Sequence, residues 1–300
     1  MYDVIIIGAG CAGLTAGIYA ARAEKKVLIL ESESFGGQIA SSPLVENYPG
    51  IKSISGNELV NDMLEQALDL GVQVELEAVI ELHDQGKTKK IVTEFNEYEA
   101  KTVIIATGLK HRSLGVAKEE QLTGHGISYC AVCDGAFFKD KVVAVVGGGN
   151  SALQNALSLT QYCPKIYLIH KRDSFRAEQK LIQKVKTKKE IEIIFDHQVI
   201  ELLGESELMG VKIESVKNKK SKLLEVAALF VAVGRSPNNQ VFADLLDLDQ
   251  AGYIVSDENC GTKIEGVFAA GDCRAKKVNQ MTTAMADGTV AALRAVARCG

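Results

Sequence analysis

Two cysteines separated by two residues are the side chains of this sequence best suited to electron transfer. Cys130 and Cys133 lie in the run Cys-Ala-Val-Cys-Asp-Gly, which places Asp134 directly after the second thiol. A Cys-x-x-Cys pair closes a short loop, so its dithiol and disulfide forms can interconvert at cellular reduction potentials. One thiolate can be stabilised by its neighbour and by local dipoles, and Asp134 can donate or accept the proton of a leaving or attacking sulfur. The pair is therefore predicted to be redox-active.

Zinc binding and passive burial are the competing interpretations of this pair. A structural zinc site normally needs two further Cys or His ligands at matching spacing. The sequence has no second Cys-x-x-Cys and no His within three residues of either cysteine, so we expect no metal. The seven cysteines are odd in number and mostly irregular in spacing, unlike a secreted disulfide framework, which favours a cytoplasmic location. The other five are expected to pack as small apolar side chains: Cys11, Cys163, Cys260, Cys273 and Cys299.

Composition narrows the possible partners. The length of 300 residues suggests two domains, and the hydrophobic fraction of 47% is ordinary for a globular protein. A net charge of −4 gives no reason to expect nucleic acid or an anionic membrane as partner. No uncharged apolar stretch approaches the roughly 18 residues of a membrane span.

The elements that position chemistry begin at the N-terminus. Residues 3–7 form an apolar, β-branched run that ends in Gly8-Ala9-Gly10-Cys11-Ala12-Gly13, followed by a helical pattern to about residue 23 and a second apolar run, 27–30, that ends at Glu31. Strand, Gly-x-Gly-x-x-Gly, helix, strand and acid is the pattern of a dinucleotide-binding βαβ unit. Gly8 would make the tight turn, Gly10 would admit the pyrophosphate, and Gly13 would allow close helix–strand packing. The helix N-terminus would face the phosphates and Glu31 a ribose diol.

The same pattern recurs about 140 residues later. Residues 142–146 lead into Gly147-Gly148-Gly149-Asn150-Ser151-Ala152, which fits Gly-x-Gly-x-x-Ala, and a helical stretch and a strand at 166–169 follow. This second strand ends in the basic run His170-Lys171-Arg172, with Arg176 four residues later. Basic groups there would pair with a 2′-phosphate that an acid would repel. The second site is therefore predicted to prefer NADPH to NADH.

Three further apolar runs end in glycine, at 103–108, 229–234 and 266–271, and the chain closes on a helical pattern from 282 to 297. Asp272 follows the last of these runs. It could cap the final helix, or lie beside a ribityl hydroxyl of a flavin, with the helix N-terminus aimed at the flavin's pyrimidine end.

Taken together, these residues closely resemble the low-molecular-weight thioredoxin reductases. The matching segments occur in the order of that family and cover essentially the whole chain. They are Gly8 to Gly13, Gly36-Gly37-Gln38, Glu46 to Gly50, Ala106-Thr107-Gly108, Cys130 to Gly135, Gly147 to Ala152 and Gly266 to Asp272.

The resemblance implies an α/β fold of two Rossmann-like domains, with an NADPH domain inserted into an FAD domain. The FAD domain would comprise residues 1–114 and 246–300, and the NADPH domain, carrying the Cys-x-x-Cys, residues 115–245. The implied FAD contacts are Gly8, Gly10, Cys11, Ala12, Gly13, Glu31, Gly37, Gln38, Asn47, Thr107, Gly108, Gly271, Asp272, Gln280 and Met281. The implied NADPH contacts are Gly147, Gly149, Asn150, Ser151, Ala152, His170, Lys171, Arg172, Arg176 and Arg235.

The resemblance also implies a homodimer that reduces thioredoxin or a thioredoxin-like thiol protein. NADPH would reduce the flavin, the flavin would reduce the disulfide through Cys133, and Cys130 would then attack the disulfide of thioredoxin. Rotation of one domain against the other would alternate these steps. The chain departs from the family pattern at Cys11 (usually Pro), Asn150 (usually Asp), Lys171 (usually Arg) and 279–281 (usually Arg-Gln-Ala).

Two alternatives keep the fold and change the electron flow. A ferredoxin-dependent flavin thioredoxin reductase would lack working NADPH motifs, whereas here they are largely intact. A flavin dithiol oxidase would pass electrons from a dithiol to oxygen and would not need the second nucleotide site. A flavin-loaded sensor without catalysis would not need the dithiol.

Overall fold

The computed structural model describes residues 1–42 and 44–300. The chain divides into two compact units: Met1–Lys110 with Ser236–Gly300, called here the outer unit, and His111–Arg235, the inserted unit. The short strands β7 (Lys110–His111) and β16 (Arg235–Ser236), at the two crossings of the chain between units, pair with each other.

The outer unit is built on a seven-stranded sheet. Its order is β3-β2-β1-β6-β5-β4, and β17 pairs with β6. The strands β1 (Tyr2–Ile7), β2 (Val27–Glu31), β3 (Gln73–Leu76), β6 (Glu97–Ile105) and β17 (Val267–Ala269) pair in parallel, whereas β4 (Val79–Asp84) and β5 (Lys89–Thr93) are antiparallel. β1 lies inside the sheet and is covered on both faces, which explains its uninterrupted apolar run.

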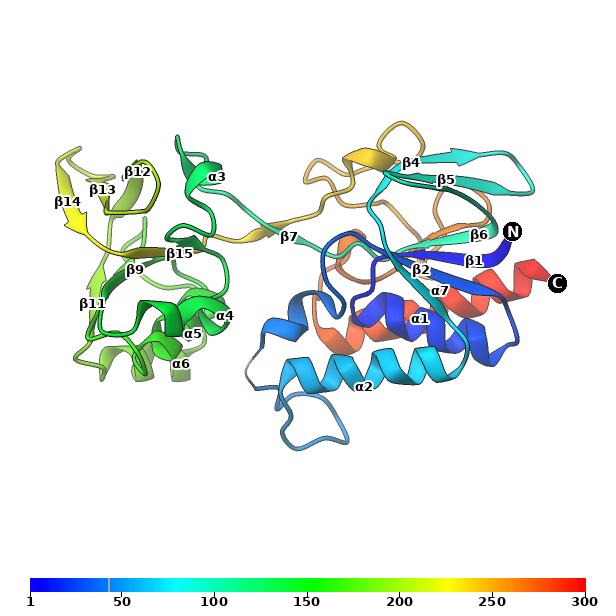
Figure 1. Ribbon diagram of the computed structural model, residues 1–300, viewed down its shortest axis with the longest axis horizontal. Coiled ribbons are helices and arrows are strands. Elements are labelled where there is room, and N and C mark those ends of the chain that lie inside the picture. The colour runs from blue at the N-terminus through cyan, green and yellow to red at the C-terminus, as the bar shows by residue number, and fades with distance from the viewer. Residues whose placement is uncertain (43) are drawn as a thin grey trace. The chain divides into compact units, whose positions relative to one another are not determined.

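Helices cover one face of this sheet (Figure 1). They are α1 (Cys11–Arg22), α2 (Gly56–Asp69) and α7 (Met281–Cys299). Their apolar residues form one core with inward-facing side chains such as Val4 and Ile6. The alternate residues Ile5 and Ile7 point into a second core, closed by Phe242 and Ile254. The short 3-10 turns of the unit are η1 (Gly37–Ser41), η3 (Gln240–Phe242) and η4 (Gly271–Cys273).

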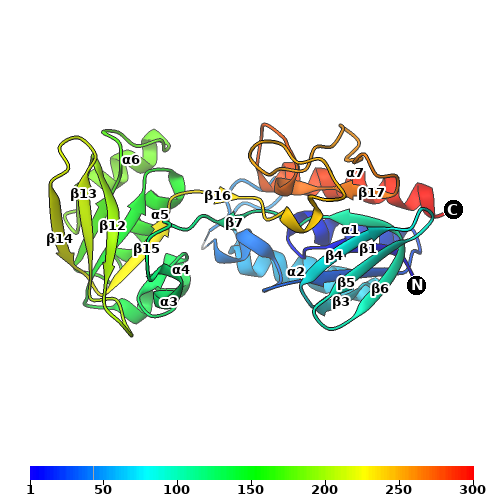
Figure 2. The same ribbon diagram turned by 90° about the horizontal axis from the view of Figure 1, so that it is seen from above.

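The inserted unit has a five-stranded parallel sheet of order β11-β10-β9-β15-β8. Its strands are β8 (Ile127–Ser128), β9 (Val142–Gly147), β10 (Lys165–Ile169), β11 (Ile191–Ile194) and β15 (Ala228–Ala232). One face packs on α4 (Ala131–Asp134), α5 (Asn150–Leu159) and α6 (Gln179–Lys186). The other packs on an antiparallel sheet of β12 (His197–Leu203), β13 (Gly210–Ser215) and β14 (Ser221–Glu225), seen side by side in Figure 2. The remaining helices are α3 (Glu119–Leu122) and the 3-10 turn η2 (Gly135–Phe138).

The unit boundaries differ from those expected from the sequence. The sequence predicts domain boundaries at 114/115 and 245/246, whereas the compact units of the structure divide at 110/111 and 235/236. Residues 236–245 belong to the outer unit because Phe242 is buried in its core. Residues 111–114 belong to the inserted unit because Leu114 packs against the core between its two sheets.

The secondary structure follows the glycine-bounded apolar runs closely. Each predicted strand and each of the three predicted helices is present, with ends shifted by a few residues. The hairpin β4–β5 and the sheet β12–β14 were not predicted from the sequence. Of the helices in residues 1–42 and 44–300, none has the length and apolar character needed to cross a bilayer.

Candidate active site

The Cys130–Cys133 pair forms a disulfide on a single helical turn. Cys130 is the N-cap of α4 and Cys133 lies within it, with their Cα atoms 5.4 Å apart, a separation that a disulfide spans without backbone movement. The backbone N–H of Cys133 donates to Cys130 Sγ at 3.2 Å. Cys130 is half-buried and Cys133 is exposed. Because an N–H donor stabilises negative charge on sulfur, this turn favours Cys130 as the thiolate when the disulfide opens.

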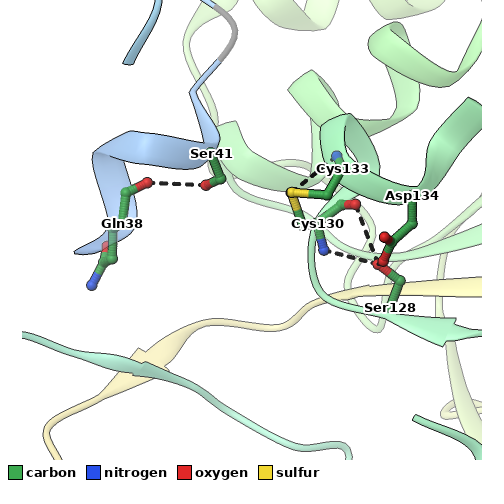
Figure 3. Close-up of a disulfide and its surroundings, with 6 residues drawn as sticks. All are labelled: Gln38, Ser41, Ser128, Cys130, Cys133 and Asp134. Atoms are coloured by element: carbon green, nitrogen blue, oxygen red, sulfur yellow. Dashed lines mark hydrogen bonds between the residues drawn. A yellow bond between two sulfur atoms is a disulfide. The ribbon is translucent and has the colours of Figure 1, made fainter. Parts of the chain in front are cut away.

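Asp134 is held beside this pair by a residue that the sequence analysis missed. Ser128, at the end of β8, lies with its Oγ 2.6 Å from Asp134 Oδ2, and the backbone N–H of Cys130 donates to the same Oγ at 3.0 Å. Figure 3 shows the serine joining the carboxylate to the cysteine turn. No spacing rule singles out this serine. It is found only once β8 and α4 are placed.

A second polar cluster anchors the residue before the pair. The buried carboxylate of Glu119 accepts from the Tyr129 hydroxyl at 2.9 Å and from the backbone N–H groups of Leu114 and Gly115 at 2.8 and 2.9 Å. Burial and then the Glu119 hydrogen bond raise the pKa of Tyr129 to about 12, so it stays a phenol. This cluster ties the start of the inserted unit to the cysteine turn, and sequence patterns gave no sign of it.

The first glycine turn has the shape of a phosphate cradle. A Cβ on Gly8, whose φ is +110°, would meet Ala106 O at 2.4 Å, and one on Gly13 would meet Gly8 O at 1.9 Å, so both positions exclude a side chain. Gly10 has open space instead, because a Cβ added to it would have its nearest non-neighbouring atom, Gly37 Cα, 4.0 Å away. Gly10 is the N-cap of α1 and supplies no side-chain cap. The first N–H groups of the helix, at Cys11 and Ala12, are therefore left for an external acceptor.

Several of the expected FAD contacts lie around this turn. The Glu31 carboxylate, at the end of β2, accepts from Ala9 N at 2.8 Å, which holds it beside the glycines. Gly37, with φ +59°, lies so close to Gly10 that a Cβ added to it would be 3.2 Å from the Gly10 Cα. The Gln38 amide donates to Leu109 O at 3.0 Å.

Asn47 and Gln280 are placed differently from these residues. Asn47 is exposed on the loop that the Val45–Ile54 bridge closes, and Gln280 is an exposed helix cap. Within residues 1–42 and 44–300, neither Asn47 nor Gln280 forms a hydrogen bond with the Gly8–Gly13 turn.

The loop after β17 joins the same turn from the other end of the chain. Gly271, with φ +79°, would place a Cβ 2.8 Å from the Cβ of Ala12, and one on Gly288 of α7 would meet Ala12 O at 2.2 Å. Asp272 follows in η4 and pairs with Lys276 Nζ at 3.4 Å. It does not cap the final helix, because Gln280 is the N-cap of α7 and forms a capping box with Thr283. Met281 is the half-buried first residue of that helix.

Asn239 is a second residue that the sequence analysis missed. It is 1% exposed. Its amide donates to the carbonyls of Gly252 and Cys273 at 2.9 Å each and accepts from the Thr107 hydroxyl at 3.2 Å. It thereby fixes Thr107, and with it the positive-φ Gly108, against the loop that carries Asp272.

Replacing Asn239 with alanine is expected to lower the free energy of unfolding by about 2–3 kcal/mol, because the Gly252 and Cys273 carbonyls and the Thr107 hydroxyl would each lose a hydrogen bond. Urea denaturation followed by circular dichroism measures the change. Asn238→Ala is the matched control, since the Asn238 side chain is exposed. This substitution should change the free energy of unfolding by under about 0.5 kcal/mol. Equal effects of the two variants would show that the amide holds nothing in place.

The second glycine turn repeats the first within the inserted unit. A Cβ on Gly147 would meet Ala232 O at 2.2 Å and Ala152 Cβ at 2.8 Å. Gly149 is the open position, its nearest atom being Arg176 O at 4.0 Å, and it starts α5 without a side-chain cap. Asn150 is occupied with Glu178: its amide donates to Glu178 Oε1 at 3.0 Å and its oxygen accepts from Glu178 N at 2.8 Å. Ser151 is exposed on the first turn of α5.

The basic residues after β10 divide into one buried and three exposed groups. The His170 ring is 8% exposed, lies where a Cβ on Gly148 would be 2.2 Å away, and has no partner for Nε2 among the described residues. Burial, then the charges of Lys171 and Arg176, lower its pKa below 6.5. Lys171, Arg172 and Arg176 are exposed, and the backbone N–H of Arg176 donates to Gly148 O at 2.7 Å, which places Arg176 beside the glycine turn.

Arg235, the remaining residue expected at the NADPH site, is half-buried in β16, at the end of the inserted unit.

The five other cysteines have the character of neutral thiols. Burial raises the pKa values of Cys11, Cys163, Cys260 and Cys273 to about 11 each. It also raises the pKa of Cys299, whose Sγ lies 3.3 Å from Asp3 O. Thiols that stay protonated are poor nucleophiles, so the redox chemistry falls to the Cys130–Cys133 pair.

Comparison with known proteins places this architecture among redox enzymes. The protein-family model described as pyridine nucleotide-disulphide oxidoreductase matches residues 2–288. The chain is 42% identical over 292 residues to the thioredoxin reductase of Listeria innocua, covering 97% of this chain and 92% of that protein. It is 44% identical over 294 residues to a "34.2 kDa protein in rubredoxin operon" of Clostridium pasteurianum, covering 98% and 96%. The crystal structure of Lactococcus lactis thioredoxin reductase is 40% identical with a TM-score of 0.94, covering 100% of this chain and 99% of that one.

Proposed function

Because this chain belongs to the pyridine nucleotide-disulphide oxidoreductase family, we propose that it is a thioredoxin-disulfide reductase using FAD and NADPH. Family membership implies the use of a flavin and a pyridine nucleotide. The observation that carries the proposal is a disulfide on a four-residue helical turn, within the same unit as the second of two glycine cradles. One cradle alone would suit many dehydrogenases. Two cradles with a redox disulfide suit an enzyme that passes electrons from a nucleotide to sulfur.

The residues of the outer unit fit FAD. The open position above Gly10 and the uncapped start of α1 suit its pyrophosphate, and Glu31 and Asp272 offer carboxylates to its ribose and ribityl hydroxyls. When bound, the flavin accepts a hydride from the nicotinamide and supplies two electrons to sulfur. The protein's part is to hold the group, exclude side chains at Gly8 and Gly13, and keep Cys11 a neutral thiol beside it.

The inserted unit supplies the sulfur chemistry. Two electrons entering at the Cys133 sulfur break the S–S bond and leave the electron pair on Cys130 Sγ, onto which the Cys133 N–H already donates. The Cys130 thiolate then attacks the disulfide of thioredoxin, and Cys133 resolves the mixed disulfide. Asp134 holds or releases the proton that these sulfurs gain and lose.

The NADPH site, homodimer and cytoplasmic location are parts of the same proposal. Lys171, Arg172 and Arg176 present three cations near the Gly147–Ala152 turn, which supports binding of a 2′-phosphate. The resemblance supports a homodimer, which light scattering of the purified protein would test. Thioredoxin is the proposed partner because the name of the 42% identical Listeria protein states that activity.

Three measurements on the purified protein test the proposal. The bound flavin is released and identified, and FAD is expected. The holoenzyme is mixed anaerobically with NADPH or NADH, and the flavin absorbance should bleach faster with NADPH. Thioredoxin reduction is then followed by NADPH consumption. A purified protein without flavin would contradict the proposal. If reduced ferredoxin bleaches the flavin and neither nucleotide does, the electron donor is a ferredoxin.

A further inference from the structure

Ser128 occupies the centre of the hydrogen bonds around the disulfide. It is 5% exposed and lies at the end of β8. Its Oγ accepts from Cys130 N at 3.0 Å and lies 2.6 Å from Asp134 Oδ2 and 3.2 Å from Cys130 O. A hydroxyl has one proton to donate, and the short contact assigns that proton to the carboxylate. Ser128 therefore joins Asp134 to the backbone of the attacking cysteine.

The Asp134 carboxylate depends on this serine for its orientation. Asp134 ends the single turn of α4, and its backbone N–H donates to Cys130 O at 3.1 Å. Among the hydrogen bonds of residues 1–42 and 44–300, the side-chain partner of its carboxylate is Ser128. Without that hydroxyl the carboxylate could rotate freely about its side-chain bonds toward solvent. A proton acceptor that leaves its position by about 1 Å loses much of its catalytic effect.

We propose that Ser128 is a positioning residue that holds the Asp134 carboxylate in place beside the cysteine turn during thiol–disulfide exchange. The inference rests on the proposed role of the cysteine pair. The Asp134 carboxylate takes the Cys130 proton, and the Cys130 thiolate that results bonds to one sulfur of the target disulfide. The other target sulfur leaves with the electron pair and takes that proton. The Cys133 thiol then attacks Cys130 Sγ, and the second target sulfur leaves and takes the Cys133 proton. The target gains two electrons and two protons, the enzyme disulfide re-forms, and the Ser128 proton stays in place.

A double-mutant cycle tests this inference on the holoenzyme. Ser128→Ala is expected to lower kcat for NADPH-driven thioredoxin reduction about tenfold, the usual effect of losing a hydrogen bond to a charged group, and to change KM for thioredoxin by under about twofold. Ser128→Thr keeps the hydroxyl and should restore kcat to within about threefold. Ser221→Ala, exposed on β14, is the matched control.

The background of Asp134→Asn separates positioning from a structural role. If Ser128 acts through the carboxylate, adding Ser128→Ala to Asp134→Asn should cost under about twofold more. If Ser128→Ala lowers kcat by the same tenfold in the Asp134→Asn background, Ser128 acts through the Cys130 backbone and the inference is wrong. Flavin content and circular dichroism of each variant establish that it is folded. If the alanine variant is not folded, Ser128→Thr provides the test. A tenfold loss of kcat in this variant, which keeps the hydroxyl, would also overturn the inference.

A second assay separates this inference from the proposed function. Holoenzyme reduced with dithiothreitol and desalted anaerobically is mixed with 5,5′-dithiobis(2-nitrobenzoate), and thiolate release is followed by absorbance. This exchange needs neither NADPH nor thioredoxin, so the same tenfold loss and the same non-additivity are expected even if wild type fails to reduce thioredoxin. Wild-type activity with unchanged rates in Ser128→Ala would overturn the inference alone.

Discussion

Replacing Cys133 with serine is expected to lower NADPH-driven thioredoxin reduction by at least about 10³-fold, because a thiol group that forms a covalent intermediate has no substitute in a hydroxyl. Binding of FAD should be unchanged, since the pair lies in the inserted unit and the cradle at Gly10 in the outer one. Flavin bleaching by NADPH should also persist. The measurement is steady-state NADPH consumption with thioredoxin, beside the flavin spectrum of the same preparation.

Cys299→Ser is the matched control for this substitution. Cys299 is also a cysteine, but it is buried and its Sγ donates to Asp3 O, a bond that a serine hydroxyl can replace. Activity within about twofold of wild type is expected. Retention of thioredoxin reduction by Cys133→Ser would show that electrons reach the partner without the disulfide.

The two cysteines should also differ from each other. When the reduced variants are mixed with oxidised thioredoxin, Cys133→Ser should accumulate a mixed disulfide through Cys130, because the resolving thiol is absent. Cys130→Ser should accumulate much less. The donation from Cys133 N to Cys130 Sγ is the structural reason for this order. Non-reducing electrophoresis reads the result, and capture by Cys130→Ser instead would exchange the two roles.

The parts of the fold that could be predicted are those in which local backbone chemistry dictates sequence. Gly8 and Gly147 adopt positive φ and face a carbonyl within 2.4 Å of any added Cβ. Glycine is therefore required there, and the strand–turn–helix pattern can be read directly. The apolar runs of β1 and β9 are uninterrupted because both faces of each sheet are covered.

The parts that could not be predicted depend on contacts between segments distant in sequence. Asn239 reaches Thr107 across 132 positions, and Ser128 gains its role only from where β8 ends. The hairpin β4–β5 escaped prediction because its exposed face interrupts the apolar pattern, as at Glu81 and His83. The expected boundary at 245/246 differs from the division of the compact units at 235/236, because the burial of Phe242, not a change of composition, decides where residues 236–245 pack.

Replacing Arg172 with alanine is expected to raise KM for NADPH by about tenfold or more and to leave KM for NADH within about twofold. A charge-assisted hydrogen bond to phosphate contributes about 1.5–3 kcal/mol, and NADH lacks the 2′-phosphate that would receive it. Arg172 is exposed three residues after the end of β10, the strand that follows the second glycine turn and its helix. Steady-state kinetics with both nucleotides at saturating thioredoxin, repeated at higher salt, measure the difference.

Lys184→Ala is the matched control for the loss of one positive charge. Lys184 is exposed on α6, the helix that follows the basic residues, so its removal should change KM for either nucleotide by under about twofold. The double variant Arg172→Ala/Arg176→Ala should weaken NADPH further, because Arg176 is tied through its backbone to Gly148. A parallel loss for NADPH and NADH would instead place these side chains at the pyrophosphate, which the two nucleotides share. No loss for either would remove the basic run from the nucleotide site, and the preference for NADPH would then need another source in the inserted unit.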